Sequence, residues 1–252
     1  MWKDYAFRFF IVDAVANSND YDLRYVRGQM ARMTSDEHDF FRFVINHSKL
    51  SYSQNIQDLW ALYETKEAPN GFFVEFGATD GINISNTALM EKQYGWNGIL
   101  AEPNPVWHEA LIKNRSAIVD KRCVHSTTGQ VLDFFNADSP EYGGVATESI
   151  NGAAKKLGMR GVMISVETVS LNDLLEGHRA PEKIDFMSLD TEGSEHLILN
   201  PFDFKKWKVR LFSIESGPAE KNLAIDRLMK ENDYIRKFEK FSGDDAWYKK
   251  TG

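Results

Sequence analysis

Gly71-Phe72-Phe73-Val74-Glu75-Phe76-Gly77-Ala78-Thr79-Asp80-Gly81 is the stretch that decides the fold. Its apolar run is typical of a buried strand, and two glycines then bracket a turn that leads into a helical pattern over Ile84–Tyr94. Strand, glycine turn and helix in this order open a nucleotide-binding α/β fold, in which glycine lets a ligand approach the backbone. The turn residues predicted to contact the ligand are Gly77, Ala78, Asp80 and Gly81.

A second landmark follows at the spacing that such a fold requires. Residues 96–104 read as a short buried strand that ends in Glu102-Pro103. An acid about twenty residues after the glycines commonly holds the two hydroxyls of a ribose. Glu102 and Pro103 are therefore predicted to bind the cofactor, and the two landmarks together predict an adenosine-containing ligand.

The turn lacks the full G-x-G-x-x-G pattern of dinucleotide-binding proteins, because only Gly77 and Gly81 are present. Glu75 lies inside the strand, where its charge would repel a pyrophosphate but would suit the cationic amine and sulfonium of S-adenosylmethionine. S-adenosylmethionine is the cofactor favoured by these residues, with Glu75 among its ligands. A dinucleotide remains an alternative, as does a strand, turn and helix without a ligand in which Glu75 only caps.

Composition limits the remaining possibilities. The 252 residues suit one α/β domain over 51–252, preceded by an N-terminal helical extension over 1–50 in which Thr34 to Glu37 form a capping box. A net charge of −7 argues against a nucleic-acid partner, and no apolar run is long enough to span a membrane. The single cysteine, Cys123, excludes an internal disulfide, so a cytoplasmic location is expected. A homo-oligomer is compatible with the sequence.

Acids crowd a second loop after a strand predicted over 183–189. This loop carries Asp190, Glu192 and His196, and the next strand, over 210–216, includes Glu215. Because the carboxyl ends of parallel strands face the ligand, we expect these side chains at the substrate. The predicted catalytic residues are Asp190, Glu192, His196 and Glu215, with His196 or Glu215 as the base and Asp190 also near the cofactor.

No metal ligands are assigned, but an alternative remains open. Asp190 and Glu215 end neighbouring strands, so they are placed to share a divalent cation that lowers the pKa of a substrate hydroxyl. Oxygen ligands favour magnesium or calcium over zinc. Acids that hold the substrate by hydrogen bonds are the favoured interpretation.

The middle of the chain is less regular. A strand predicted over 117–124 leads to Ser126, which is expected to contact adenine, and residues 130–136 alternate like an added edge strand. Glycines interrupt residues 138–161, an insertion where contacts specific to the substrate are expected.

With these residues identified, the chain resembles the FkbM-type S-adenosylmethionine-dependent methyltransferases from about Ser51 to its C-terminus. The stretches that carry the resemblance are Ser53-Gln54-x-x-Gln57-Asp58, the glycine turn at 71–81, Glu102-Pro103, Thr168-x-x-Leu171-x-Asp173-Leu174-Leu175 and Asp190-x-Glu192-Gly193-x-Glu195. Thr191 departs from the residue that many relatives have, without changing the pattern of acids.

The resemblance implies a Rossmann-like class I methyltransferase fold: a seven-stranded, mostly parallel sheet flanked by helices, with its last strand antiparallel. It also implies O-methylation of a hydroxyl on a sugar, a polysaccharide precursor or a small natural product, so the expected partner is a small molecule or a glycan. Two alternatives remain, a nicotinamide-dependent oxidoreductase on the same sheet and a non-catalytic module that binds S-adenosylmethionine.

Overall fold

The computed structural model describes residue 28 and residues 30–149, 158–217 and 219–252. In chain order the elements are α3 (Ser35–His47), η1 (Ser48–Leu50), α4 (Gln57–Thr65), β1 (Phe72–Phe76), α5 (Ala88–Tyr94), β2 (Asn97–Ala101), α6 (Pro105–Asn114), β3 (Ile118–Asp120), β4 (Cys123–His125), β5 (Val131–Ala137), η2 (Pro140–Tyr142), β6 (Gly144–Val145), α7 (Ala146–Ser149), β7 (Gly161–Ser170), α9 (Leu171–Gly177), β8 (Lys183–Leu189), α10 (Glu195–Leu199), β9 (Lys208–Glu215), α11 (Ala219–Glu231), β10 (Tyr234–Lys237) and β11 (Asp245–Lys250).

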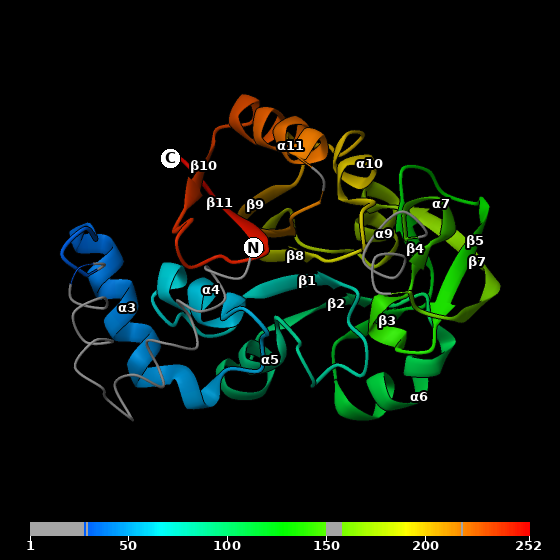
Figure 1. Ribbon diagram of the computed structural model, residues 1–252, viewed down its shortest axis with the longest axis horizontal. Helices are drawn as coiled ribbons and strands as arrows, with labels where there is room; N and C mark the ends of the chain where they lie inside the picture. Colours follow the sequence, from blue (N-terminus) through cyan, green and yellow to red (C-terminus); the bar gives the residue numbers. More distant parts are fainter. Residues whose placement is uncertain (1–27, 29, 150–157, 218) are drawn as a thin grey trace.

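Seven strands form the central sheet, in the order β10-β11-β9-β8-β1-β2-β3 (Figure 1). All neighbouring pairs are parallel except the two that β11 makes with β9 and β10. This confirms the predicted mostly parallel sheet with an antiparallel last strand. As a consequence the carboxyl ends of β1, β2, β8 and β9 lie at one edge, where a ligand is expected in such a fold.

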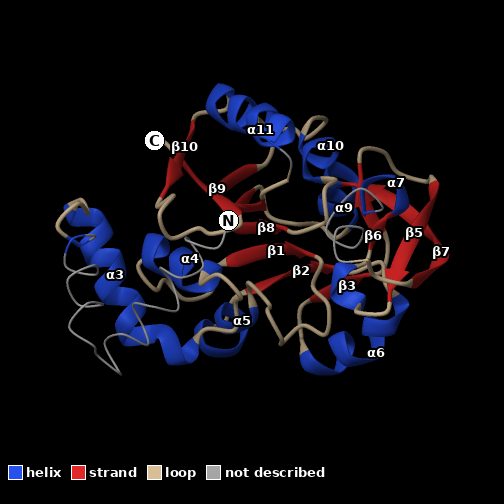
Figure 2. Cartoon of the chain, in the orientation of Figure 1, coloured by secondary structure: helices blue, strands red, loops and turns tan. Residues whose placement is uncertain are grey.

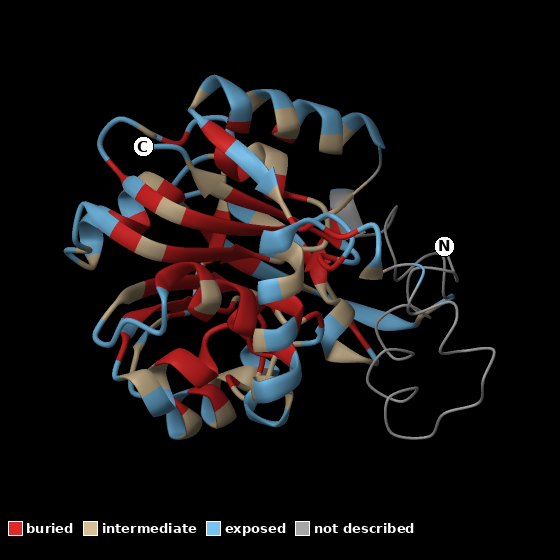
Figure 3. Ribbon diagram, turned by 90° about the vertical axis from the view of Figure 1, so that its left-hand side faces the viewer, coloured by how far each residue is buried: buried red, intermediate tan, exposed pale blue. Residues whose placement is uncertain are grey.

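Helices cover both faces of this sheet, as expected for strands with nearly continuous apolar runs. On one face α9, α10 and α11 bury leucine, isoleucine and methionine side chains against the strands, with Leu174, Leu199 and Met229 fully enclosed. On the other face α4, α5 and α6 contribute Trp60, Leu89 and other buried side chains. The strands are accordingly buried between helices whose outer surfaces are exposed (Figure 3).

Helix α3 also packs on this second face. Its N-cap is Thr34, whose hydroxyl accepts from the Glu37 amide while the Glu37 carboxylate accepts from the Thr34 amide, which confirms the predicted capping box. Phe40 of α3 stacks on Phe238 at 4.5 Å and meets the edge of Trp247 at 6.0 Å between ring centroids. The rest of the helical extension predicted over 1–50 lies largely outside the described residues, and the domain boundary stays a prediction.

A second sheet, of four strands in the order β4-β7-β5-β6, lies beside the central one (Figure 2). Two sequence expectations were wrong here. The strand predicted over 117–124 is divided into β3 and β4, because the Asp120 side chain accepts from the Arg122 amide and closes a turn between them. Residues 130–136 form no added edge of the central sheet, because β5 pairs with β7 on one side and β6 on the other.

The helix predicted over Ile84–Tyr94 also begins later than expected, at Ala88. The intervening residues are extended or turn-like, and Ile84 makes an isolated bridge with Ser53. None of the helices in the described ranges is both long and apolar enough to cross a bilayer.

Candidate functional site

A cleft opens at the edge of the sheet where the parallel strands end, and it encloses about 640 Å³ when the part open to solvent is counted. The residues that line it are Phe76, Gly77, Thr79, Ile84, Ala101, Glu102, Pro103, Trp107, Cys123, Val124, Phe134, Pro140, Glu141, Gly143, Gly144, Val145, Asp190, Thr191, Glu192 and Ser194. They come from the ends of β1, β2 and β8 and from the second sheet.

Gly77 allows the ends of two strands to meet at this cleft. Its φ is +70°, and a β-carbon placed on it would lie 2.2 Å from the carbonyl oxygen of Asp190. Its amide donates to the carbonyl oxygen of Ala101, at 3.1 Å. The turn after β1 is thus held against both neighbouring strands, and only glycine combines this backbone conformation with this approach.

Glu102 is held at the wall of the cleft by two backbone amides. One carboxylate oxygen accepts from Thr79 at 2.9 Å, and the other accepts from Asn104 at 2.8 Å. Burial raises the pKa of Glu102 to about 7; the two amides oppose this rise, and the charge of Glu75 adds to it. Each oxygen keeps a further lone pair, so the carboxylate is oriented to accept hydrogen bonds from a pair of hydroxyls.

The position of Glu102 depends on the helix that follows it. Asn104 is the N-cap of α6, where its side chain accepts from the Val106 amide, and Pro105 is the first helical residue. The predicted cofactor residues Glu102 and Pro103 therefore both line the cleft.

Glu75, which was expected to contact the cofactor, is hydrogen-bonded to residues of the protein itself. Its carboxylate accepts from the Asn86 amide at 2.6 Å, from the Ser85 hydroxyl at 3.0 Å and from the Thr87 hydroxyl, and it lies 3.6 Å from the Arg115 guanidinium. Glu75 is buried and does not line the cleft. Through these contacts Glu75 holds the loop after the glycine turn in place, and its direct contact with the cofactor stays a prediction.

Arg115 completes that structural network. Its guanidinium donates to the carbonyl oxygen of Gly81 and to the Ser85 and Thr87 hydroxyls at 2.8–3.0 Å, and it forms an ion pair with Glu91 at 2.8 Å. The side chain has no exposed surface. The sequence offered no signal for this role, since an arginine after a helix is ordinarily solvated.

Three other predicted turn residues lie behind the cleft surface. Asp80 accepts from the amides of Ile82 and Asn83 at 2.8 Å, which closes the turn, and Ala78 is buried. Gly81 donates to the Ala78 carbonyl oxygen. These residues shape the turn, while Gly77 and Thr79 line the cleft, and the contacts of Ala78, Asp80 and Gly81 with the cofactor stay predictions.

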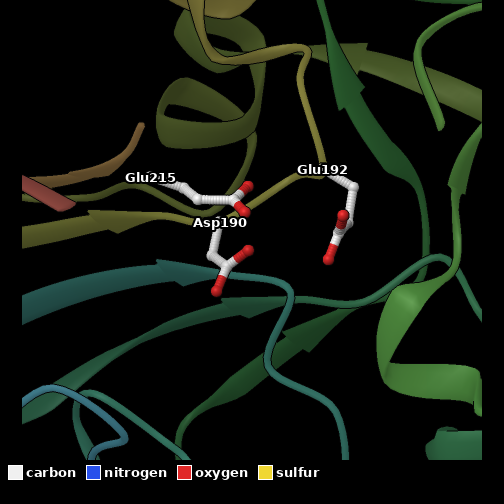
Figure 4. Close-up of side chains that lie close together, drawn as sticks. All are labelled: Asp190, Glu192 and Glu215. Atoms are coloured by element: carbon white, nitrogen blue, oxygen red, sulfur yellow. The ribbon is translucent and has the colours of Figure 1, made fainter. Parts of the chain in front are cut away.

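Asp190, Glu192 and Glu215 converge at the opposite wall, with carboxylate oxygens that lie within 4.8 Å of one another (Figure 4). Asp190 follows β8 directly, Glu192 lies in the next turn with a φ of +56°, and Glu215 is the last residue of β9. Parallel pairing of β8 with β9 explains why Asp190 and Glu215 meet, as the sequence predicted.

This proximity changes how the three acids ionise. Burial, with the negative charge of Glu192, raises the pKa of Asp190, and burial with the charge of Asp190 raises that of Glu215. Burial, with the charge of Glu195, raises the pKa of Glu192 to about 7. The close approach of Asp190 and Glu215 thus favours the protonated form of these carboxyl groups.

Two further acids support this loop. Glu195 accepts from the amides of Thr191 and Gly193 at 2.9 and 3.1 Å, which holds the turn that carries Glu192. Asp245 of β11 pairs with Glu215 in the sheet and accepts from the Gln57 amide group at 2.5 Å. Glu195 and Gln57 belong to the sequence motifs described above, and both act on the site through the loop and strand that they hold.

Two candidates lie outside the lining of the cleft. His196 is in the first turn of α10, beyond the acids. Ser126 follows β4, and its hydroxyl is 3.2 Å from the His125 ring. Cys123 and Val124, just before it in β4, line the cleft, and the contact of Ser126 with adenine stays a prediction.

The second sheet supplies contacts that spacing did not reveal. Phe134 of β5 and the segment 140–145 around η2 and β6 line the cleft, and Glu141 is among them. The insertion predicted over 138–161 thus reaches the site. No pattern in the sequence singled out its individual residues, because strand pairing across an irregular segment is decided by tertiary contacts.

Comparisons with known proteins agree with this geometry. Residues 75–236, more than half of the chain, match the family described as the methyltransferase FkbM domain. No curated protein matches the chain at a significant level.

Three solved structures are among those to which the chain is similar. The precorrin-6Y C5,15-methyltransferase of Geobacter metallireducens is 11% identical over 79% of this chain and 88% of its own, with a TM-score of 0.40. The fibrillarin pre-rRNA processing protein of Methanococcus jannaschii is 12% identical over 72% of this chain and 66% of its own, with a TM-score of 0.36. The human methyltransferase 10 domain containing protein is 10% identical over 76% and 78%, with a TM-score of 0.34.

Proposed function

Because the chain belongs to the family of FkbM methyltransferase domains, we propose that it transfers a methyl group from S-adenosylmethionine to a hydroxyl of a sugar, a polysaccharide precursor or a small natural product. The observation that supports this proposal is the pairing of two walls in one cleft. Glu102 is oriented by the Thr79 and Asn104 amides on one side, and three acids converge on the other.

The cofactor residues in this proposal are Gly77, Glu102, Pro103 and Asp190, all of which line the cleft. Glu102 binds the ribose hydroxyls through the lone pairs that its amide partners leave free. S-adenosylmethionine, when bound, supplies a methyl group already activated by a sulfonium. The protein has to align an acceptor oxygen with that carbon and to accept one proton.

Glu192 is the base that the geometry favours. It lines the cleft, and its pKa of about 7 matches that of a group that takes up a proton near neutral pH. Asp190 and Glu215, whose carboxylates lie beside that of Glu192, hold the acceptor by hydrogen bonds. His196 lies behind this wall and is the weaker candidate for the base.

A divalent cation is the second possibility that a specific observation favours. Three carboxylates with oxygens within 4.8 Å of one another match the oxygen ligands that magnesium prefers. A cation held there would lower the pKa of an acceptor hydroxyl. The raised pKa values of Asp190 and Glu215 also reduce the repulsion between these acids without a metal. We therefore retain the proposal in which the acids bind no cation.

The first test is the binding of S-adenosylhomocysteine by calorimetry. We expect Glu102→Ala to weaken binding by about 1–3 kcal/mol, because polar groups of the ligand lose their partner. Glu109→Ala, an exposed change on α6, serves as the matched control. Equal affinity of both variants would show that the ribose lies elsewhere.

The second test is transfer of a labelled methyl group to a panel of hydroxylated acceptors. Transfer that is lost in Glu192→Gln, with binding of S-adenosylhomocysteine retained, supports the proposed base. Binding without transfer to any acceptor would favour the non-catalytic module, and binding of NADH alone would favour the oxidoreductase.

A further inference from the structure

The charged residues in the lining of the cleft are all acids. They are Glu102, Glu141, Asp190 and Glu192, and Glu215 adds its carboxylate to the same cluster. Among the described residues that line the cleft there is no lysine, arginine or histidine. The acids come from four separate segments, so the negative charge surrounds the cleft and is not confined to one loop.

Two arginines near residues of the cleft each form ion pairs with carboxylates elsewhere in the protein. Arg115 is enclosed behind the glycine turn with Glu75 and Glu91. Arg122, next to the cleft residue Cys123, binds the Asp120 carboxylate with two of its nitrogens. Neither of these two guanidinium groups could meet an anionic group in the cleft without breaking an existing ion pair.

Lys221 approaches the acidic loop from α11. Its ammonium donates to the carbonyl oxygen of Gly193 at 2.8 Å, and the residue does not line the cleft. Lys221 thus holds the backbone of the loop that carries Glu192.

Phosphate and carboxylate ligands are recognised through arginine forks, lysines or the amides at a helix N-terminus. Here such a group would face carboxylates at short range, with part of the solvent excluded, where repulsion between like charges is strong. An ammonium group in the same position would be attracted, and it would relieve the repulsion that makes the three clustered acids retain protons.

The remaining lining suits the body of a hydroxylated molecule. Trp107, Phe134, Pro140 and Val145 supply apolar surface among the acids. Aromatic faces attract cations and pack against C–H groups. The cleft thus offers both apolar contact and hydrogen-bond acceptors.

We propose that the methyl acceptor is an alcohol that is uncharged or carries an ammonium group, such as an amino sugar, and is not a phosphorylated or carboxylated molecule. This inference rests on the proposed function and narrows its substrate class. It excludes sugars carried on a nucleoside diphosphate from the acceptors in the proposal above.

Four probes that share one ring test it: methyl glucoside, glucosamine, glucuronic acid and glucose 6-phosphate. Binding of each probe to the protein saturated with S-adenosylhomocysteine is measured by ligand-observed NMR. Methyl transfer to each probe is measured by incorporation of a labelled methyl group. Both experiments are done with EDTA and repeated with magnesium. We expect the neutral and ammonium probes to exceed the two anionic ones by at least about tenfold in affinity or in kcat/KM.

A charge reversal supplies the internal check. Glu141 is exposed, so Glu141→Lys is expected to fold, and it should reduce the advantage of glucosamine over glucose 6-phosphate by about tenfold. Glu182→Lys is the matched control, because Glu182 precedes β8 at the opposite end of the strand and should leave the ratio unchanged.

Preference for an anionic probe, with or without magnesium, would overturn the inference, and so would failure of both methyl glucoside and glucosamine to bind. Anionic preference that appears only with magnesium would show that the acids hold a metal that recruits the phosphate. Binding of S-adenosylhomocysteine is measured first. Its absence would refute the proposed function, whereas its presence with an anionic preference would refute this inference alone.

Discussion

Replacement of Gly77 by alanine tests the contact that brings the two halves of the site together. A residue with a β-carbon at a φ of +70° costs about 1–2 kcal/mol. The same β-carbon would lie 2.2 Å from the Asp190 carbonyl oxygen, and forcing extra volume into a packed site costs a further ~1–3 kcal/mol. We therefore expect Gly77→Ala to lose about 2–5 kcal/mol of unfolding free energy.

Gly129→Ala separates the two contributions. Gly129 has a φ of +80°, and a β-carbon there would meet no atom within 4 Å, so this variant carries the backbone cost alone. Both are compared with the wild type by urea unfolding and by titration with S-adenosylhomocysteine. We expect Gly77→Ala to be the less stable of the two and to bind at least about tenfold more weakly, because the turn and Asp190 must move apart. If the two variants were equally stable, the close approach of β1 to β8 would be refuted.

Three further outcomes are expected. Arg115→Met should lower the free energy of unfolding in urea by about 3–5 kcal/mol, because it leaves the buried Glu75 carboxylate without its charge partner. Arg42→Met, which breaks an exposed ion pair, is the control. If Arg115→Met lost no more stability than Arg42→Met, Glu75 would not need a cation. Because the pKa of Glu192 rises from 4.5 to about 7 on folding, the folded protein binds the proton more tightly, and stability should fall as pH rises through this interval. Glu192→Gln should make that fall shallower in unfolding experiments from pH 5 to pH 7.5; an unchanged slope would contradict the burial of this carboxyl group. Exhaustive chelation should leave methyl transfer undiminished, and activity that is lost and then restored by magnesium would assign a cation to Asp190, Glu192 and Glu215.

The sequence alone determined those features that depend on local pattern. The apolar runs ending at Phe76 and Leu189 became parallel strands, and the capping box at Thr34 began a helix as predicted. An acid directly after such a strand must lie at the carboxyl edge of the sheet, so Glu102 and Asp190 could be placed at one cleft before any contact was known.

Only the tertiary structure decided which partner each charge has. Glu75 looked like a ligand for a cation, but Arg115 and the hydroxyls of Ser85 and Thr87 satisfy it inside the protein. Glu141 had no signal at all, and the pairing of the second sheet brings it to the cleft. Spacing along the chain determines which face of a helix or strand a residue occupies. Its contact partner comes from a distant segment, so that partner is decided by how the elements pack together.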